Sequence, residues 1–207
     1  MSIKAIIFDM DGVLIEAKEW HFESLNKALE LFGFHISRYD HLVTYDGLPT
    51  KKKLDMLSME RNLPLGLHGL INELKQIYTL DMVHTLCKPI FCHQRALASL
   101  RKEGYKLGLC SNSIRQTVNL MMQKSDLNQF LDHSLSNEDV QQSKPHPEIY
   151  TKIISHFKLD PKECLVLEDN ANGIKAALAS GAHLMKVQNI YDVSYENIKK
   201  RIQEIEQ

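Results

Sequence analysis

The chain has 207 residues, of which 43% are hydrophobic and 25% charged, and its formal net charge is −1. These values are ordinary for a folded globular protein, and a nearly neutral chain has no overall positive field to attract nucleic acid. No apolar stretch approaches the length of a transmembrane helix, and the N-terminus lacks a signal-peptide pattern. Four cysteines without a Cys-x-x-Cys pair are typical of reduced thiols. We therefore expect a cytoplasmic protein that binds neither nucleic acid nor membrane.

The first predicted element is a buried strand over residues 3–8, which runs directly into Asp9-Met10-Asp11-Gly12. Two carboxylates at the end of a buried strand are costly unless something uses them. Residues two apart along a strand point the same way, so a turn at Gly12 can aim both acids into one cleft. The pattern favours a divalent cation beside one nucleophilic carboxylate, and the alternative is a solvated turn.

The segment that follows shows helical periodicity without a strand signal. Apolar residues recur at helical spacing over residues 20–32, and further helices are predicted near 50–61 and 67–78. We expect residues 16–85 to form a small α-helical cap domain inserted after the first strand. The lysine run 51–53 is typical of a solvated helix face.

From residue 86 onward, predicted strands and helices alternate. Strands are expected at 106–110, 132–135, 164–168 and 184–187, and helices at 91–102, 114–124, from Pro147, at 173–180 and at 195–205. This order predicts an α/β core domain, residues 1–15 and 86–207, with a Rossmann-like parallel sheet covered on both faces. Ligands bind beyond the carboxyl ends of such strands, where Asp9, Ser111 and Asp169 all fall.

Four short motifs follow one another in a fixed order along the chain. They are Asp9-Met10-Asp11-Gly12-Val13, Ser111 after an apolar strand, Lys144-Pro145-His146-Pro147, and Glu168-Asp169-Asn170 with Gly173 beyond it. Together they resemble the signatures of the haloacid dehalogenase superfamily of phosphohydrolases. The similarity covers nearly the whole chain. It is strongest to the branch that holds β-phosphoglucomutase and related sugar-phosphate phosphatases, whose helical cap is inserted at the same point.

The resemblance implies a role for each motif in phosphoryl transfer. Asp9 would be the nucleophile that forms an aspartyl phosphate, and Asp11 the general acid and base. Ser111 would donate its hydroxyl and backbone N–H to the phosphoryl group, and Asn112 a backbone amide. Lys144 would offset negative charge on Asp9 and on the phosphoryl oxygens.

The resemblance also implies a metal site. Asp9, the backbone carbonyl of Asp11 and Asp169 would bind the cation, with Glu168 either ligating it or holding a ligand water. Ligation by oxygen alone suits Mg²⁺.

Residues that would contact the rest of the substrate are predicted mainly in the cap. The resemblance implies that His21 helps to position Asp11. Thr50 stands where the mutase pattern has an arginine that grips a second phosphate, and Lys51 or Arg115 is a possible substitute. Lys and Arg are not interchangeable for bidentate phosphate binding, so these departures favour a phosphatase over a mutase.

The expected enzyme is a Mg²⁺-dependent phosphatase that hydrolyses a small phosphorylated metabolite, such as a sugar phosphate, as a monomer or weak homodimer. Two alternatives stay open at this stage. One is a hexose-phosphate mutase of the β-phosphoglucomutase type, and the other is a non-catalytic phosphate- or partner-binding protein on the same fold.

Overall fold

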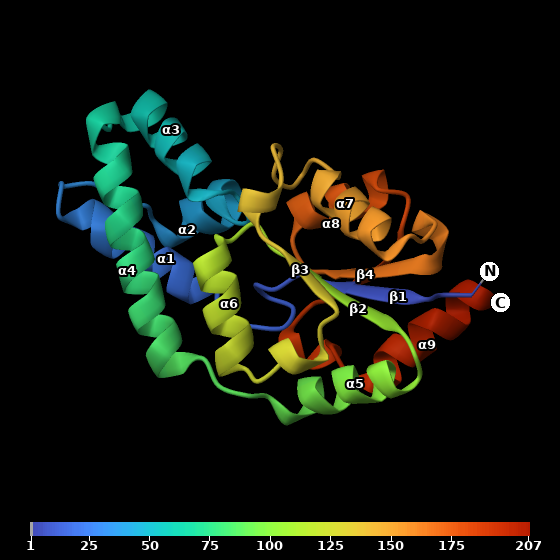
Figure 1. The fold of residues 1–207 in the computed structure, drawn as a ribbon. Helices are drawn as coiled ribbons and strands as arrows, with labels where there is room; N and C mark the ends of the chain where they lie inside the picture. Colours follow the sequence, from blue (N-terminus) through green and yellow to red (C-terminus); the bar gives the residue numbers. More distant parts are fainter. Residues whose placement is uncertain (1) are drawn as a thin grey trace. The chain divides into compact units, whose positions relative to one another are not determined.

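The computed structural model describes residues 2–207, and the chain folds as two compact units. One unit joins the N-terminal residues up to Glu16 to Cys87–Gln207, and the other is Ala17–Leu86. The first unit contains the sheet, whereas the second is built from helices (Figure 1). No helix within residues 2–207 combines the length and the apolar character that crossing a membrane requires.

The larger unit contains a five-stranded parallel sheet in the order β3-β2-β1-β4-β5. Its strands are β1 (Ala5–Phe8), β2 (Lys106–Cys110), β3 (His133–Leu135), β4 (Cys164–Glu168) and β5 (His183–Lys186). The predicted α/β fold with a parallel sheet is confirmed. Every residue of the central strand β1 and of its neighbour β4 is buried, which fits the apolar sequence of β1 and the apolar run that precedes Glu168 in β4.

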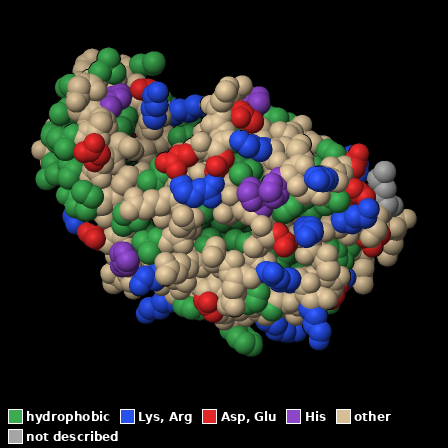
Figure 2. Space-filling model, in the orientation of Figure 1, with side chains coloured by type: hydrophobic (Ala, Val, Ile, Leu, Met, Phe, Trp, Pro, Cys, Tyr) green, Lys and Arg blue, Asp and Glu red, His purple; other side chains and the backbone are tan. Residues whose placement is uncertain are grey.

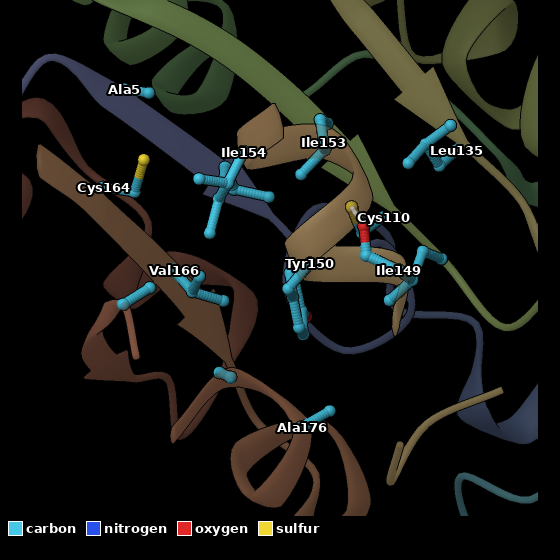
Figure 3. Packing of buried hydrophobic residues seen from close by; sticks show 13 residues of the cluster. Ala5, Cys110, Leu135, Ile149, Tyr150, Ile153, Ile154, Cys164, Val166 and Ala176 are labelled. Atoms are coloured by element: carbon cyan, nitrogen blue, oxygen red, sulfur yellow. Dashed lines mark hydrogen bonds between the residues drawn. The ribbon is translucent and has the colours of Figure 1, made fainter. Parts of the chain in front are cut away.

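Helices cover both faces of this sheet, with α7 and α8 on one face and α5 and α9 on the other (Figure 1). The helices of this unit are α5 (Phe91–Lys102), α6 (Arg115–Lys124), α7 (Glu148–Phe157), α8 (Ala171–Ala179) and α9 (Tyr195–Glu206). Figure 3 shows α7 placing its apolar side chains against β2 and β4, around Cys110 and Val166. The approach is close, since a Cβ atom on Gly108 of β2 would lie 2.6 Å from Ile153 Cδ1.

The smaller unit is a helical bundle with its own apolar core. It contains α1 (Lys18–Glu30), the short α2 (Arg38–Asp40), a π-helical turn (His41–Tyr45), α3 (Thr50–Arg61) and α4 (His68–Leu86). Its buried cluster includes Leu25, Leu29, Leu54, Leu57 and Ile71.

Two sequence-based expectations for this bundle were wrong. Helix α4 was predicted to end near residue 78 but continues to Leu86. Its buried stripe contains Lys75 and Thr79 between Ile71 and Val83, so two polar side chains masked the helical periodicity. The lysine run was predicted to be a solvated face, yet Lys53 lies on the buried side of α3 beside Leu54.

The surface of the larger unit carries no single dominant charge on the face in Figure 2. Lys and Arg side chains lie scattered there among Asp and Glu side chains.

Candidate active site

The site begins in a tight turn after the central strand β1. Asp9 directly follows the strand and is 8% exposed, and its N–H donates to Leu167 O at 3.0 Å. The turn closes where the Gly12 N–H donates to Ile15 O at 2.7 Å. Gly12 has φ +85°, a conformation that glycine adopts without strain. The turn therefore places Asp9 and Asp11 beyond the carboxyl end of the sheet.

Lys144 is a buried lysine that joins two acidic residues. Its Nζ lies 2.6 Å from Asp9 Oδ1 and 2.7 Å from Glu168 Oε1, and it also donates to Cys110 O at 2.9 Å. The residue is 3% exposed. An ammonium group so deeply buried is stable only when paired, and here two carboxylates satisfy it.

Asp9, Glu168 and Asp169 form an acidic cluster at the ends of β1 and β4. Each offers one carboxylate oxygen, and these oxygens lie within 4.8 Å of one another. Three carboxylates against the single ammonium of Lys144 leave two negative charges, which one divalent cation balances. The donor set is oxygen alone, as hard divalent cations prefer. These residues therefore fit a divalent metal site.

Electrostatics in the cluster follow from its burial. Burial raises the pKa of Asp9 well above its ordinary value, and the neighbouring Glu168 charge adds to this effect while Lys144 opposes it. Burial also acts to lower the pKa of Lys144, but the carboxylates of Asp9 and Glu168 outweigh it and raise that pKa. Lys144 therefore stays protonated, and further positive charge beside Asp9 would favour the ionised form of that carboxyl.

The loop after β2 supplies hydroxyl and amide groups next to these acids. Ser111 is completely buried, and its Oγ accepts a hydrogen bond from the Ser113 N–H at 3.0 Å. The Ser113 hydroxyl donates to Asp11 Oδ2 at 3.1 Å. Asn112 holds the backbone of Lys144, since its Oδ1 accepts from the Lys144 N–H at 3.1 Å and its Nδ2 donates to Lys144 O at 3.4 Å.

The remaining predicted residues have other surroundings. The Arg115 guanidinium bonds Asp139 and the Ser134 carbonyl, so its charge is already paired within the α/β unit. His21, Thr50 and Lys51 belong to the helical unit. Thr50 is the half-buried first residue of α3, and Lys51 is exposed.

His21 has a partner that sequence reasoning missed. Its Nδ1 lies 3.3 Å from the Nζ of Lys75, a buried lysine on α4. Ser113 and Tyr150 were also missed, and both bond to acidic residues of the site. A signal existed for these two, since Ser113 lies two residues after Ser111 and Tyr150 six residues after Lys144. Nothing in the sequence distinguished Lys75 from a solvated helix lysine.

Comparison with known proteins identifies the family. The sequence profile of haloacid dehalogenase-like hydrolases matches residues 6–187, and the chain belongs to this family. The predicted membership is therefore confirmed, and with it the assignment of the chain as a hydrolase.

The individual relatives have low sequence identity to this chain. Pyrophosphatase PpaX of Anoxybacillus flavithermus is 27% identical over 184 residues, which cover 87% of this chain and 81% of that protein. A phosphorylated carbohydrates phosphatase of Thermotoga maritima is 25% identical over 197 residues, covering 92% and 85%. Among solved structures, a β-phosphoglucomutase of Clostridium difficile matches with a TM-score of 0.84 at 20% identity, over 98% of both chains. This structural likeness shows a shared fold.

Proposed function

We propose that this protein is a Mg²⁺-dependent phosphatase that hydrolyses a small phosphorylated metabolite, most simply a sugar phosphate, through an aspartyl-phosphate intermediate. One observation carries the proposal. The buried Asp9 carboxylate lies beside Lys144 Nζ, within a cluster of acids suited to a divalent cation. A carboxylate nucleophile next to concentrated positive charge is what attack on a phosphate monoester requires.

Asp9 would attack the phosphorus atom and displace the leaving alcohol. Lys144 would offset the charge that builds up on the phosphoryl oxygens, because its ammonium already lies 2.6 Å from Asp9 Oδ1. The Ser111 hydroxyl and the Asn112 backbone amide would bind the same phosphoryl group. The N-terminus of α6 follows this loop closely, and its dipole favours bound anions.

Asp11 would serve as the general acid and then as the general base. It would protonate the leaving oxygen, and it would later take a proton from the water that attacks the aspartyl phosphate, which restores Asp9. The Ser113 hydrogen bond to Asp11 Oδ2 supports this role, since it restrains a side chain that must face the leaving group.

The metal would be held by Asp9, Asp169, the backbone carbonyl of Asp11 and, directly or through water, Glu168. A bound Mg²⁺ would neutralise negative charge on the carboxylates and on the phosphoryl oxygens. The larger Ca²⁺ takes more ligands and would disturb the in-line geometry, so it is expected to inhibit.

The substrate class draws support from the relatives. Two of them are named for hydrolysis of pyrophosphate and of phosphorylated carbohydrates. His21, Thr50 and Lys51 are our candidates for contacts with the part of the substrate beyond the phosphate. Arg115 would have to leave Asp139 before it could bind a second phosphate.

The test measures release of inorganic phosphate from a panel of sugar phosphates, other phosphomonoesters and pyrophosphate. Asp9→Asn should reduce turnover to background, whereas Asp126→Asn, at an exposed aspartate of the same unit, should retain it. No release from any compound would remove the enzymatic proposal and leave a binding protein. Turnover that requires a hexose 1,6-bisphosphate primer would assign a mutase instead.

A further inference from the structure

Tyr150 on α7 is a buried tyrosine whose hydroxyl reaches the acidic cluster. We propose that Tyr150 is a positioning residue for the divalent cation. It fixes the Glu168 carboxylate so that one oxygen binds Lys144 and the other is directed to the cation or its water. This inference rests on the metal site of the proposed function, and it assigns a role to a residue outside the four sequence motifs.

The contacts of Tyr150 restrain the Glu168 carboxylate and the ammonium of Lys144. Its hydroxyl donates to Glu168 Oε1 at 2.5 Å, and Lys144 Nζ donates to the same oxygen at 2.7 Å. Lys144 Nζ also lies 4.8 Å from the centre of the Tyr150 ring, so the ring face and the hydroxyl both serve one ion pair. Tyr150 is completely buried, and Figure 3 shows its side chain projecting from α7 among the packed residues.

The opposite side of Glu168 is closed by the backbone of α8. A Cβ atom on Gly173 would lie 1.9 Å from Glu168 Oε1 and 2.2 Å from Oε2, so the carboxylate occupies the space that a side chain would fill. The Asp169 N–H donates to Oε2 at 3.2 Å. The carboxylate is thus restrained by two donors on Oε1, one on Oε2, and a glycine without a side chain.

This arrangement gives the two carboxylate oxygens of Glu168 different roles. Oε1 accepts two strong donors, which leaves Oε2 as the oxygen suited to contribute to the acidic cluster with Asp9 and Asp169. Without the Tyr150 hydroxyl, Lys144 alone would hold Oε1, and the carboxylate would be less tightly restrained about its terminal torsion. Groups that orient metal-binding carboxylates typically contribute about 10–100-fold to metal affinity.

The test is direct binding of Mn²⁺, a paramagnetic stand-in for Mg²⁺, followed by electron paramagnetic resonance without substrate. Tyr150→Phe retains the ring and removes the hydroxyl, and it should raise the Kd for Mn²⁺ by about 10-fold. Tyr45→Phe is the matched control, because Tyr45 is also buried and its hydroxyl donates to Glu60 Oε2 at 3.0 Å within the helical unit. It should bind Mn²⁺ as the wild type does.

A double-mutant cycle separates positioning from a general loss of structure. In a Glu168→Gln background, Tyr150→Phe should have no further effect on the Kd, because the carboxylate it positions is gone. If Tyr150→Phe raises the Kd for Mn²⁺ by the same factor in both backgrounds, the inference is overturned. Wild-type affinity in Tyr150→Phe would overturn it as well. If Tyr150→Phe does not fold, Gly173→Ala displaces the same carboxylate from the other side. It should weaken Mn²⁺ binding equally, and unchanged affinity would overturn the inference.

Failure of the proposed function gives a different result. Wild-type protein that binds Mn²⁺ through the Tyr150–Glu168 pair but releases no phosphate from any compound would end the phosphatase proposal and retain the positioning role.

Discussion

Removal of the buried ammonium of Lys144 should destabilise the metal-free protein strongly. Lys144→Met keeps most of the length of the side chain but leaves Asp9 and Glu168 buried without their shared cation. Breaking a buried ion pair by removing one partner costs about 3–5 kcal/mol. For a chain of this size, each kcal/mol lowers the melting temperature by about 2–4 °C, so we expect a fall of roughly 6–20 °C at pH 7 in EDTA.

The loss should depend on pH and on metal in a defined direction. The folded-state pKa of Asp9 is raised, and loss of Lys144 raises it further because an opposing positive charge is removed. A raised carboxyl pKa means that the folded state binds the proton more tightly than the unfolded state does, so the variant regains stability as the pH falls. Added Mg²⁺ should raise the melting temperature of Lys144→Met more than that of the wild type, since the cation then replaces the positive charge that Lys144 supplied.

Thermal melting by circular dichroism, with and without Mg²⁺ at pH 5.5 and 7.5, measures these effects. Lys152→Met is the control, because Lys152 is exposed on α7 and its ammonium donates to a backbone carbonyl, Asp139 O, at the surface. Such a surface change should stay within about 0.5 kcal/mol. If Lys144→Met and Lys152→Met have the same melting temperature in EDTA, the reasoning is refuted.

Three further predictions concern activity and packing. Asp11→Asn should slow hydrolysis of a sugar phosphate by about 10²–10⁴-fold. It should slow hydrolysis of an aryl phosphate far less, because an aryl leaving group needs little protonation. Equal losses on both substrates would assign Asp11 a structural role only. Thr50→Ala and Lys51→Ala should change KM values and the ranking of substrates while the Mg²⁺ requirement persists, and an unchanged ranking would exclude these two residues from substrate selection. Gly108→Val should lower the melting temperature, because its side chain would collide with Ile153, and a wild-type melting curve would contradict the packing described here.

Much of the α/β unit could be predicted from the sequence because its signals are local. Residues 164–167 are apolar, which predicted a strand over 164–168, and the structure places β4 at Cys164–Glu168. The boundaries of α5 and α3 were likewise predictable from apolar spacing and from Gly104 beyond α5. The C-terminal boundary of α4 could not be predicted in this way, because Lys75 and Thr79 occupy the buried stripe of that helix.

The sequence by itself determined which residues at strand ends gather at the site. Asp9, Ser111 and Asp169 each follow a predicted strand, and parallel strands bring their carboxyl ends to one edge of the sheet. That rule needs only the order of the elements.

Only the tertiary structure decided how the charges are paired. Tyr150 contacts Glu168 because α7 packs across the sheet, and Arg115 is committed to Asp139 because the chain returns beside β3. The three adjacent lysines 51–53 differ in burial because only Lys53 falls on the inward side of α3. Such contacts join residues far apart in the chain, and they depend on distances of a few ångströms between side chains. Local propensity and spacing carry no information about those distances.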